Sequence, residues 1–245
     1  MRGVPRFACV FAHPDDETFS TGGTLARAAA AGVRIDLFCA TDGDAGKTSG
    51  IAVASRAELA AIRRAELAAA ARLLGIASLA TPGHGDGVLR EVDADRLIGE
   101  IVLFLRTHRP DVIVSFGPEG APTGHRDHRA ISRAATAAFF LAGLPTEYPE
   151  QLREADPHRP SRLYYVAWEP PADDAELRIL SVPFTARVDV TAHLETKRRA
   201  FLTHASQRQH QRRFEELALR DNEYFALAAG TPQPRPVTED LFEGL

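Results

Sequence analysis

The sequence has little of what marks several common classes of protein. Its 245 residues include only two cysteines, Cys9 and Cys39, which excludes a disulfide-stapled scaffold and a zinc module built on several cysteines. The formal net charge is −4 at pH 7, so the overall charge does not attract nucleic acid or an anionic membrane. No stretch approaches the ~18 consecutive apolar residues of a membrane-spanning helix, and the first residues reach acidic side chains too soon for a secretory signal. We expect a cytoplasmic protein with reduced thiols and no membrane or nucleic-acid partner, and homo-oligomer formation stays open.

The sequence does contain an alternation of short apolar runs with longer helical stretches. Apolar residues make up 44% of the chain, which is enough for one sizeable core. The apolar runs have the composition of strands buried on both faces of a parallel sheet, and they lie at Phe7–Ala12, Ile35–Thr41 and Val112–Phe116. Helices are expected at Ser55–Gly75, from Asp93 to before Pro110, and over about 127–141. This alternation predicts a Rossmann-like α/β fold, with a mostly parallel sheet flanked by helices.

The last part of the chain has a different composition. Residues 144–162 are rich in proline and charge, and we expect them to form a long loop or lid that selects the substrate. Further strands are expected at Leu163–Trp168 and Val182–Val190, and a helix from Thr191 to about Ala205. Three prolines lie within residues 231–240, which predicts an extended tail. The simplest division is a single 1–245 domain, with a core at about 6–145, a C-terminal elaboration at about 146–230 and the tail at 231–245.

Two polar clusters follow predicted strands. His13–Glu17 comes directly after the first strand, and Gly124–Arg129 lies a few residues after Val112–Phe116. In an open parallel sheet, ligands bind beyond the carboxyl ends of the strands. We therefore expect the two clusters to form one site, although they are far apart in the sequence.

The residue types in these clusters are those that zinc accepts when cysteine is absent. Three protein ligands with one open position are typical of a catalytic zinc site. His13 and Asp16 are close enough in sequence to bind one ion from a tight turn, and His128 can supply the third ligand. Two nitrogens and a carboxylate also suit iron, so iron is a possible metal in the cell.

The neighbours of these three ligands suit acid–base chemistry. Asp15 is a carboxylate beside the metal that is free to accept a proton from water. His125 is free to act as an acid or to stabilise an oxyanion, and Asp127 can orient one of the histidines. The alternative is that both clusters are merely helix starts, where acidic side chains are favoured. Their joint position after two strands favours a functional site.

These motifs resemble those of the N-acetylglucosaminyl-phosphatidylinositol de-N-acetylase family, also called PIG-L or LmbE-like proteins. The most specific are AHPDDE at 12–17 and GH-x-DH at 124–128. Four shorter motifs are also similar, at Thr41–Gly46, Arg63–Leu67, Asp86–Gly87 and His204–Gln207. The resemblance covers most of residues 6–210, and it departs from the family at Arg126, where many members carry proline.

The resemblance implies a zinc-dependent enzyme that removes an N-acyl group from an N-acetylated amino sugar. It implies the three metal ligands named above, with Asp15 as the general base. His125 would stabilise the oxyanion and help to protonate the leaving amine. Arg63 and Asp86 would contact sugar hydroxyls or nearby substrate groups. Since other residues supply the apolar face of its helix, replacing Arg63 by alanine is expected to raise KM and to leave stability unchanged.

Three other functions remain open from the sequence. Within the family, the alternative is an amidase acting on thiol conjugates or on another N-acyl metabolite. A nucleotide-binding dehydrogenase or methyltransferase also uses a parallel sheet, but it would carry G-x-G-x-x-G after the first strand, where this chain has HPDDE. A nucleic-acid-binding protein would use the basic stretch 197–213, but the glutamates around that stretch favour a solvated helix face.

Overall fold

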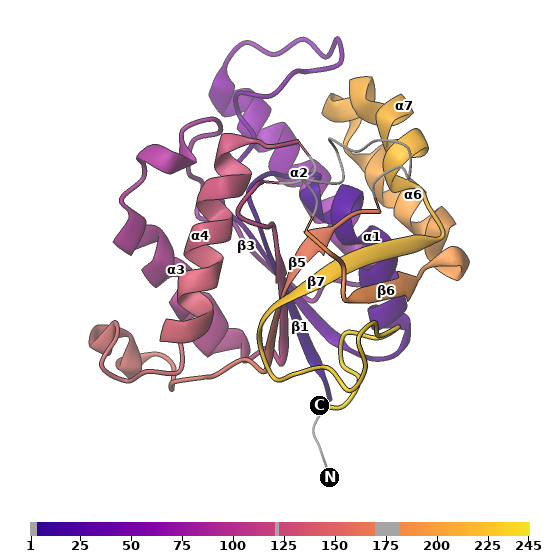
Figure 1. Cartoon of the computed structure of the whole chain (residues 1–245). Helices are drawn as coiled ribbons and strands as arrows, with labels where there is room; N and C mark the ends of the chain where they lie inside the picture. The colour runs from indigo at the N-terminus through magenta and orange to yellow at the C-terminus, as the bar shows by residue number, and fades with distance from the viewer. Residues whose placement is uncertain (1–3, 121–122, 170–181) are drawn as a thin grey trace.

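The computed structural model describes residues 4–120, 123–169 and 182–245. These residues form a seven-stranded sheet in the order β3-β2-β1-β4-β5-β7-β6, with helices on both faces (Figure 1). Strands β1 to β5 run parallel, whereas β7 is antiparallel to both β5 and β6. The strands are β1 (Arg6–Phe11), β2 (Arg34–Cys39), β3 (Ser78–Ala80), β4 (Val112–Ser115), β5 (Arg162–Ala167), β6 (Ala186–Asp189) and β7 (Asn222–Gly230). The predicted Rossmann-like α/β fold with a mostly parallel sheet is confirmed.

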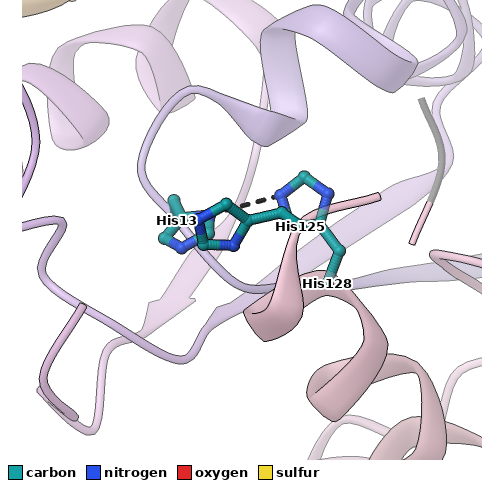
Figure 2. Close-up of side chains that lie close together, drawn as sticks. All are labelled: His13, His125 and His128. Carbon is teal, nitrogen blue, oxygen red and sulfur yellow. Dashed lines mark hydrogen bonds between the residues drawn. The ribbon is translucent and has the colours of Figure 1, made fainter. Parts of the chain in front are cut away.

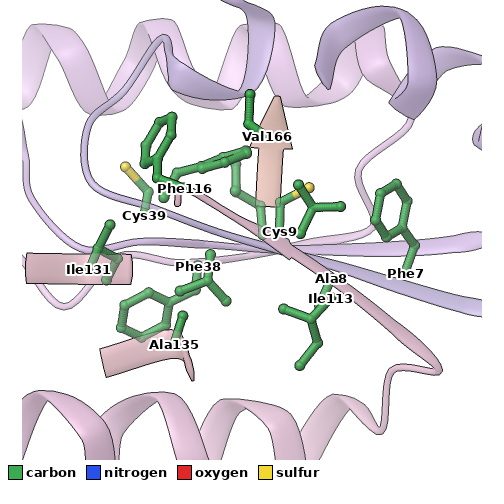
Figure 3. Packing of buried hydrophobic residues seen from close by; sticks show 14 of the residues in the cluster. Phe7, Ala8, Cys9, Phe38, Cys39, Ile113, Phe116, Ile131, Ala135 and Val166 are labelled. Atoms are coloured by element: carbon green, nitrogen blue, oxygen red, sulfur yellow. The ribbon is translucent and has the colours of Figure 1, made fainter. Parts of the chain in front are cut away.

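The core is centred on β1, which lies between β2 and β4. Its side chains from Phe7 to Phe11 are buried because helices cover both faces of the sheet. Figure 3 shows Phe7 and Cys9 of this strand packed among apolar side chains from neighbouring elements, including Ile113 and Phe116. Both cysteines are free and buried in this core.

The main helices lie in two groups, one on each face of the sheet. Helices α1 (Asp16–Ala30), α2 (Arg56–Leu74) and α6 (Leu194–Thr203) pack together, and α3 (Ala94–His108) packs on α4 (Arg126–Leu141) (Figure 1). The helix predicted at Ser55–Gly75 is confirmed as α2: Ser55 Oγ accepts the Glu58 N–H, and Gly75 ends the helix at φ 75°. Among the described residues, no helix is long and apolar enough to cross a membrane.

Helix α1 was not predicted beyond a possible helix start at the first cluster, and it carries Gly22 and Gly23 in its middle. Glycine in a helix interior costs about 1 kcal/mol relative to alanine. The structure gives the reason for both glycines: a Cβ at Gly23 would lie 2.5 Å from Val190 Cβ, and one at Gly22 would lie 2.9 Å from Lys197 Cγ. The glycines therefore allow the C-terminal part of the chain to approach the first helix closely.

The C-terminal part completes the sheet. The expected strand at Leu163–Trp168 corresponds to β5, and the one at Val182–Val190 is shorter in the structure, as β6. Strand β7 was missed, although it pairs with both. The expected extended tail is wrong, because residues 231–245 fold back onto the sheet. The Arg162 guanidinium donates to the carbonyls of Thr231, Pro232, Leu241 and Glu243 in this segment.

The expected lid at residues 144–162 lies away from the predicted site. Helix α4 starts at the carboxyl edge of the sheet and returns the chain to the amino edge, where β5 begins (Figure 1). There, the buried Arg106 guanidinium of α3 donates to the carbonyls of Ala142, Leu144, Glu147 and Tyr148. This segment therefore cannot select a substrate at the opposite edge, and the lid interpretation is wrong.

Candidate active site

The site lies where the strand order changes direction. From β1 the chain continues to β2 and β3 on one side, while β4 and β5 lie on the other side. Such a switch point leaves a crevice beyond the carboxyl ends of the two central strands, and ligands bind there in open α/β sheets. The first cluster follows β1 and opens α1, and the second precedes and opens α4. The structure therefore brings both clusters together, as the sequence predicted.

Three side chains form a compact triangle at this switch point. His128 Nε2 lies 3.3 Å from His13 Nδ1 and 3.2 Å from Asp16 Oδ1, and His13 Nδ1 lies 3.5 Å from Asp16 Oδ2. All three residues are buried. Figure 2 shows the His13 and His128 rings with this contact dashed and the His125 ring beside them. The His128 ring is held in place by stacking on Phe116, with 3.9 Å between centroids and 6° between planes.

This triangle fits a divalent metal ion. Ligands about 2.0–2.2 Å from a tetrahedral zinc lie about 3.3–3.6 Å apart, and the three separations of 3.2, 3.3 and 3.5 Å are within about 0.1 Å of that range. Asp16 is kept ionised for this role: burial raises its pKa, but His128 and His13 outweigh that effect and lower the pKa below its usual range. The backbone N–H groups of Ala12 and His13 also donate to Asp16 Oδ2.

His125 is the other candidate for the third ligand, because its ring also lies close to His13 and His128. Its place in the fold argues against that role. His125 is the N-cap of α4, where Nδ1 accepts the Asp127 N–H at 3.2 Å. His125 is exposed, and its Nε2 is not the atom used for the cap. Burial, followed by the charges of His13 and His128, lowers the pKa of His125, which favours the neutral ring.

Two carboxylates orient His13 from behind. Its Nε2 lies 3.4 Å from Asp127 Oδ2 and 3.2 Å from Asp86 Oδ1. Donation from Nε2 leaves Nδ1 with a free lone pair toward Asp16 and His128. Asp127 is itself fixed by the N–H groups of Gly87 and Leu89. Asp127 thus lies where it can orient a histidine, as the sequence suggested, and Asp86 contacts the same imidazole. The expected contact of Asp86 with substrate stays a prediction.

Replacing Asp127 by asparagine is therefore expected to weaken metal binding by about 10–100-fold. Asparagine keeps one acceptor oxygen. Its amide nitrogen, in place of the other oxygen, cannot accept a hydrogen bond from a backbone N–H group or from the His13 imidazole. Competition with a chelator measures the change in affinity. Asp240→Asn is the control, because that residue lies exposed near the C-terminus and its carboxylate accepts the local Phe242 N–H, far from the metal triangle in the sequence. Equal metal affinity in both variants would mean that Asp127 does not orient His13.

Asp15 stands beside the triangle in a strained backbone conformation. It has φ 110°, a value that non-glycine residues rarely adopt and that costs on the order of 1–3 kcal/mol. Burial raises the pKa of Asp15 to about 6, although the nearby Arg63 opposes the shift. A carboxylate with a raised pKa is a better proton acceptor near neutral pH. Strain and pKa together indicate a residue held in place for chemistry.

Arg63 has a different environment from the one that the sequence suggested. It is buried, its Nη1 donates to Gly43 O at 2.9 Å, and its Nη2 donates to Pro14 O and lies 3.5 Å from Asp15 Oδ2. A Cβ at Gly43 would collide with the guanidinium, so the glycine-containing loop is built around this arginine. These buried contacts argue against the expectation that Arg63 is dispensable for stability, because the guanidinium joins two loops of the site.

Arg63→Ala is expected to lower the free energy of unfolding by about 2–4 kcal/mol, because it leaves two buried carbonyls without a donor. Arg64→Ala is the matched control from the same turn of α2. Arg64 is half-exposed and pairs with Asp42, so its loss should cost at most about 1 kcal/mol. Chemical denaturation of the two variants measures the difference. Equal stabilities would show that the Arg63 contacts contribute nothing to the fold.

Sequence reasoning missed two buried residues next to Asp15. Glu17 Oε1 accepts a hydrogen bond from His204 Nε2 at 2.8 Å, and Glu17 Oε2 accepts one from the Asp15 N–H at 2.9 Å. Both side chains are at most 1% exposed. The motif at His204–Gln207 was the available signal, but no pattern in the sequence shows that it packs against the first helix.

Comparison with known proteins agrees with this geometry. The model of the PIG-L family, described as GlcNAc-PI de-N-acetylase, matches residues 8–139. The chain belongs to the PIG-L family. Among curated members, it is 32% identical to a 1D-myo-inositol 2-acetamido-2-deoxy-alpha-D-glucopyranoside deacetylase of Mycobacterium sp. (strain KMS), over 95% of this chain and 86% of that protein. This membership excludes the dehydrogenase and methyltransferase alternatives.

Solved structures of similar proteins show how widely the fold is used. This PIG-L chain matches the N,N'-diacetylchitobiose deacetylase of Pyrococcus horikoshii with a TM-score of 0.73 and 25% identity, over 91% of this chain and 83% of that one. It also matches GalB, the 4-carboxy-2-hydroxymuconate hydratase of Pseudomonas putida KT2440, with a TM-score of 0.76, 18% identity, and 95% and 99% coverage. The second match shows the fold alone. Substrate chemistry must therefore be argued from the site.

The basic stretch 197–213 is not one exposed helix in this PIG-L protein. It is divided between α6, a 3-10 segment and the short α7 (Gln211–Arg213). Lys197 is buried, with its Nζ 2.6 Å from Glu223 Oε1, and Arg212 pairs with Glu216. The first of its basic side chains is therefore used inside the fold rather than on a surface that could contact nucleic acid.

Proposed function

We propose that this protein is a metal-dependent hydrolase that removes the acetyl group from an N-acetylglucosamine-type amino sugar or a related small glycoconjugate. The observation that carries the proposal is the triangle of His13, Asp16 and His128 with the strained carboxylate of Asp15 beside it. Three buried ligands next to a proton acceptor are what hydrolysis of an unactivated amide requires. The deacetylases among the relatives support an amino-sugar substrate.

The three ligands would hold zinc, or iron(II), which accepts the same donors. Zinc, when bound, supplies a Lewis acid that polarises the amide carbonyl and lowers the pKa of water. The Asp15 carboxylate then takes a proton from the attacking water. The neutral His125 ring, whose Nδ1 already accepts the Asp127 N–H, carries its proton on Nε2. It donates a hydrogen bond from there to the oxyanion, and the protonated Asp15 returns the proton taken from water to the leaving amine.

A screen for amine release with fluorescamine tests the proposal on the zinc-loaded protein. The panel contains N-acetylglucosaminyl-inositol, N,N'-diacetylchitobiose, free N-acetylglucosamine and a thiol-conjugate amide. We expect release from at least one N-acetyl sugar, and loss of that release with a chelator. Release from the thiol conjugate alone would favour the amidase alternative, and release from no compound on the panel would contradict this substrate class.

A further inference from the structure

The peptide unit that joins Pro14 to Asp15 is held at both of its polar ends. Its carbonyl, Pro14 O, accepts a hydrogen bond from the buried Arg63 guanidinium, and its N–H donates to Glu17 Oε2 at 2.9 Å. The orientation of this peptide sets the φ angle of Asp15, which is 110°. A strained conformation persists only where its surroundings fix it more strongly than the strain opposes it. The two hydrogen bonds are the local contacts that do so.

Glu17 needs a partner of its own to hold this orientation. Its second oxygen, Oε1, accepts from His204 Nε2 at 2.8 Å, and the two side chains are 1% and 0% exposed. With both oxygens engaged, the carboxylate is fixed about its last torsion. Without the imidazole, this buried carboxylate loses one of its two hydrogen-bond partners and is free to rotate away from the Asp15 N–H.

His204 is placed by the segment that follows α6. Ser206 donates from its N–H and its hydroxyl to the Glu66 carboxylate of α2, at 2.8 and 2.6 Å. Gln207 Nε2 donates to Lys47 O in the loop after β2. The segment is thus attached at two more points around the site, and it lies beyond residues 8–139, the part matched by the family model.

We propose that His204 and Glu17 are positioning residues that hold the Asp15 carboxylate in its reactive geometry, a role that rests on the function proposed above. His204 does not contact substrate in this account. It acts through Glu17 on the Asp15 N–H, from a part of the chain that comes late in the sequence. The C-terminal elaboration is therefore part of the catalytic apparatus as well as of the sheet.

The same molecule provides a matched control. Glu223 of β7 accepts from the N–H groups of Gly23 and Thr24 in α1, at 2.9 and 2.8 Å, and from Lys197 Nζ at 2.6 Å. This pair is as buried as the Glu17–His204 pair and holds the backbone of the same helix. It differs in being about two turns away from Asp15 along the helix.

The test compares His204→Leu with Lys197→Met, and each with the wild type. Both variants remove the donor to a buried glutamate, so both should lower Tm. Only His204→Leu should lower kcat, by about 10–100-fold, at unchanged KM and metal content. Lys197→Met should keep kcat within about twofold. His204→Gln, which restores a donor of similar reach, should recover most of the activity and supplies a folded variant if the leucine variant does not fold.

A crystal structure of His204→Leu, or of His204→Ala if needed, reads the backbone directly and does not depend on activity. We expect Asp15 to leave its positive φ. An unchanged φ, or a kcat loss no larger than that of Lys197→Met at similar Tm, would overturn the positioning role even if the wild type is an active deacetylase. A displaced Asp15 with wild-type kcat would instead overturn the function assigned to Asp15.

Discussion

Asp15→Asn is expected to bind metal normally and to lose about 10²–10⁴-fold in kcat, the usual contribution of a positioned acid–base group. The amide is nearly isosteric with the carboxylate, and asparagine tolerates positive φ better than most residues. The contacts that fix this backbone are made by Glu17 and Arg63 to main-chain atoms, so they are unaffected. The variant therefore removes the proton acceptor and, besides it, the charge that lies 3.5 Å from Arg63 Nη2.

Metal content and kcat must be measured on the same preparation of this variant. Asp93→Asn is the control, because Asp93 caps α3 far along the chain and asparagine caps helices equally well. That variant should match the wild type in both measurements. Normal metal content with a normal rate in Asp15→Asn would mean that another group accepts the proton from water.

His128→Ala is expected to abolish high-affinity metal binding, and with it turnover. His128 Nε2 is the corner of the triangle nearest to both other ligands, and alanine leaves two ligands in a buried, acidic pocket. Removing the hydrogen-bond partner of a metal-ligating histidine lowers metal affinity by about 10–100-fold. Removing the ligand itself should lower the affinity by more than that. Metal analysis after dialysis measures the bound ion.

His125→Ala distinguishes the two possible ligand sets. If His125 is a hydrogen-bond donor to the substrate and not a ligand, this variant should retain one metal per chain and lose rate. His128→Ala also removes a ring stacked on Phe116, so its folding has to be verified by circular dichroism. Full retention of metal in a folded His128→Ala protein would remove His128 from the ligand set.

The convergence of the two clusters could be predicted from the sequence for a simple reason. Parallel strands end at the same edge of a sheet, so His13–Asp16 and His125–His128 had to meet if both followed central strands. The residue types then limited the chemistry to a metal site with an acidic neighbour. The strand order adds that β1 and β4 are adjacent, which no local pattern specifies.

The remaining features depend on packing that local patterns do not encode. Burial of Arg63 follows from the loop around Gly43, and the contact of His204 with Glu17 spans 187 positions. The lid error had a different origin. The composition of residues 144–162 correctly predicted a loop. Helix α4 begins at the carboxyl edge of the sheet and returns the chain to the amino edge, where the parallel strand β5 begins. The loop between them therefore lies at the amino edge, on the side of the sheet away from the site.

The most direct test of this account is the position of the metal in crystals of the zinc-loaded protein, located by anomalous diffraction at the zinc edge. The account predicts one peak, in contact with His13 Nδ1, the Asp16 carboxylate and His128 Nε2. A peak held by His125 in place of Asp16, or one on the Nε2 side of His13 between Asp86 and Asp127, would contradict it.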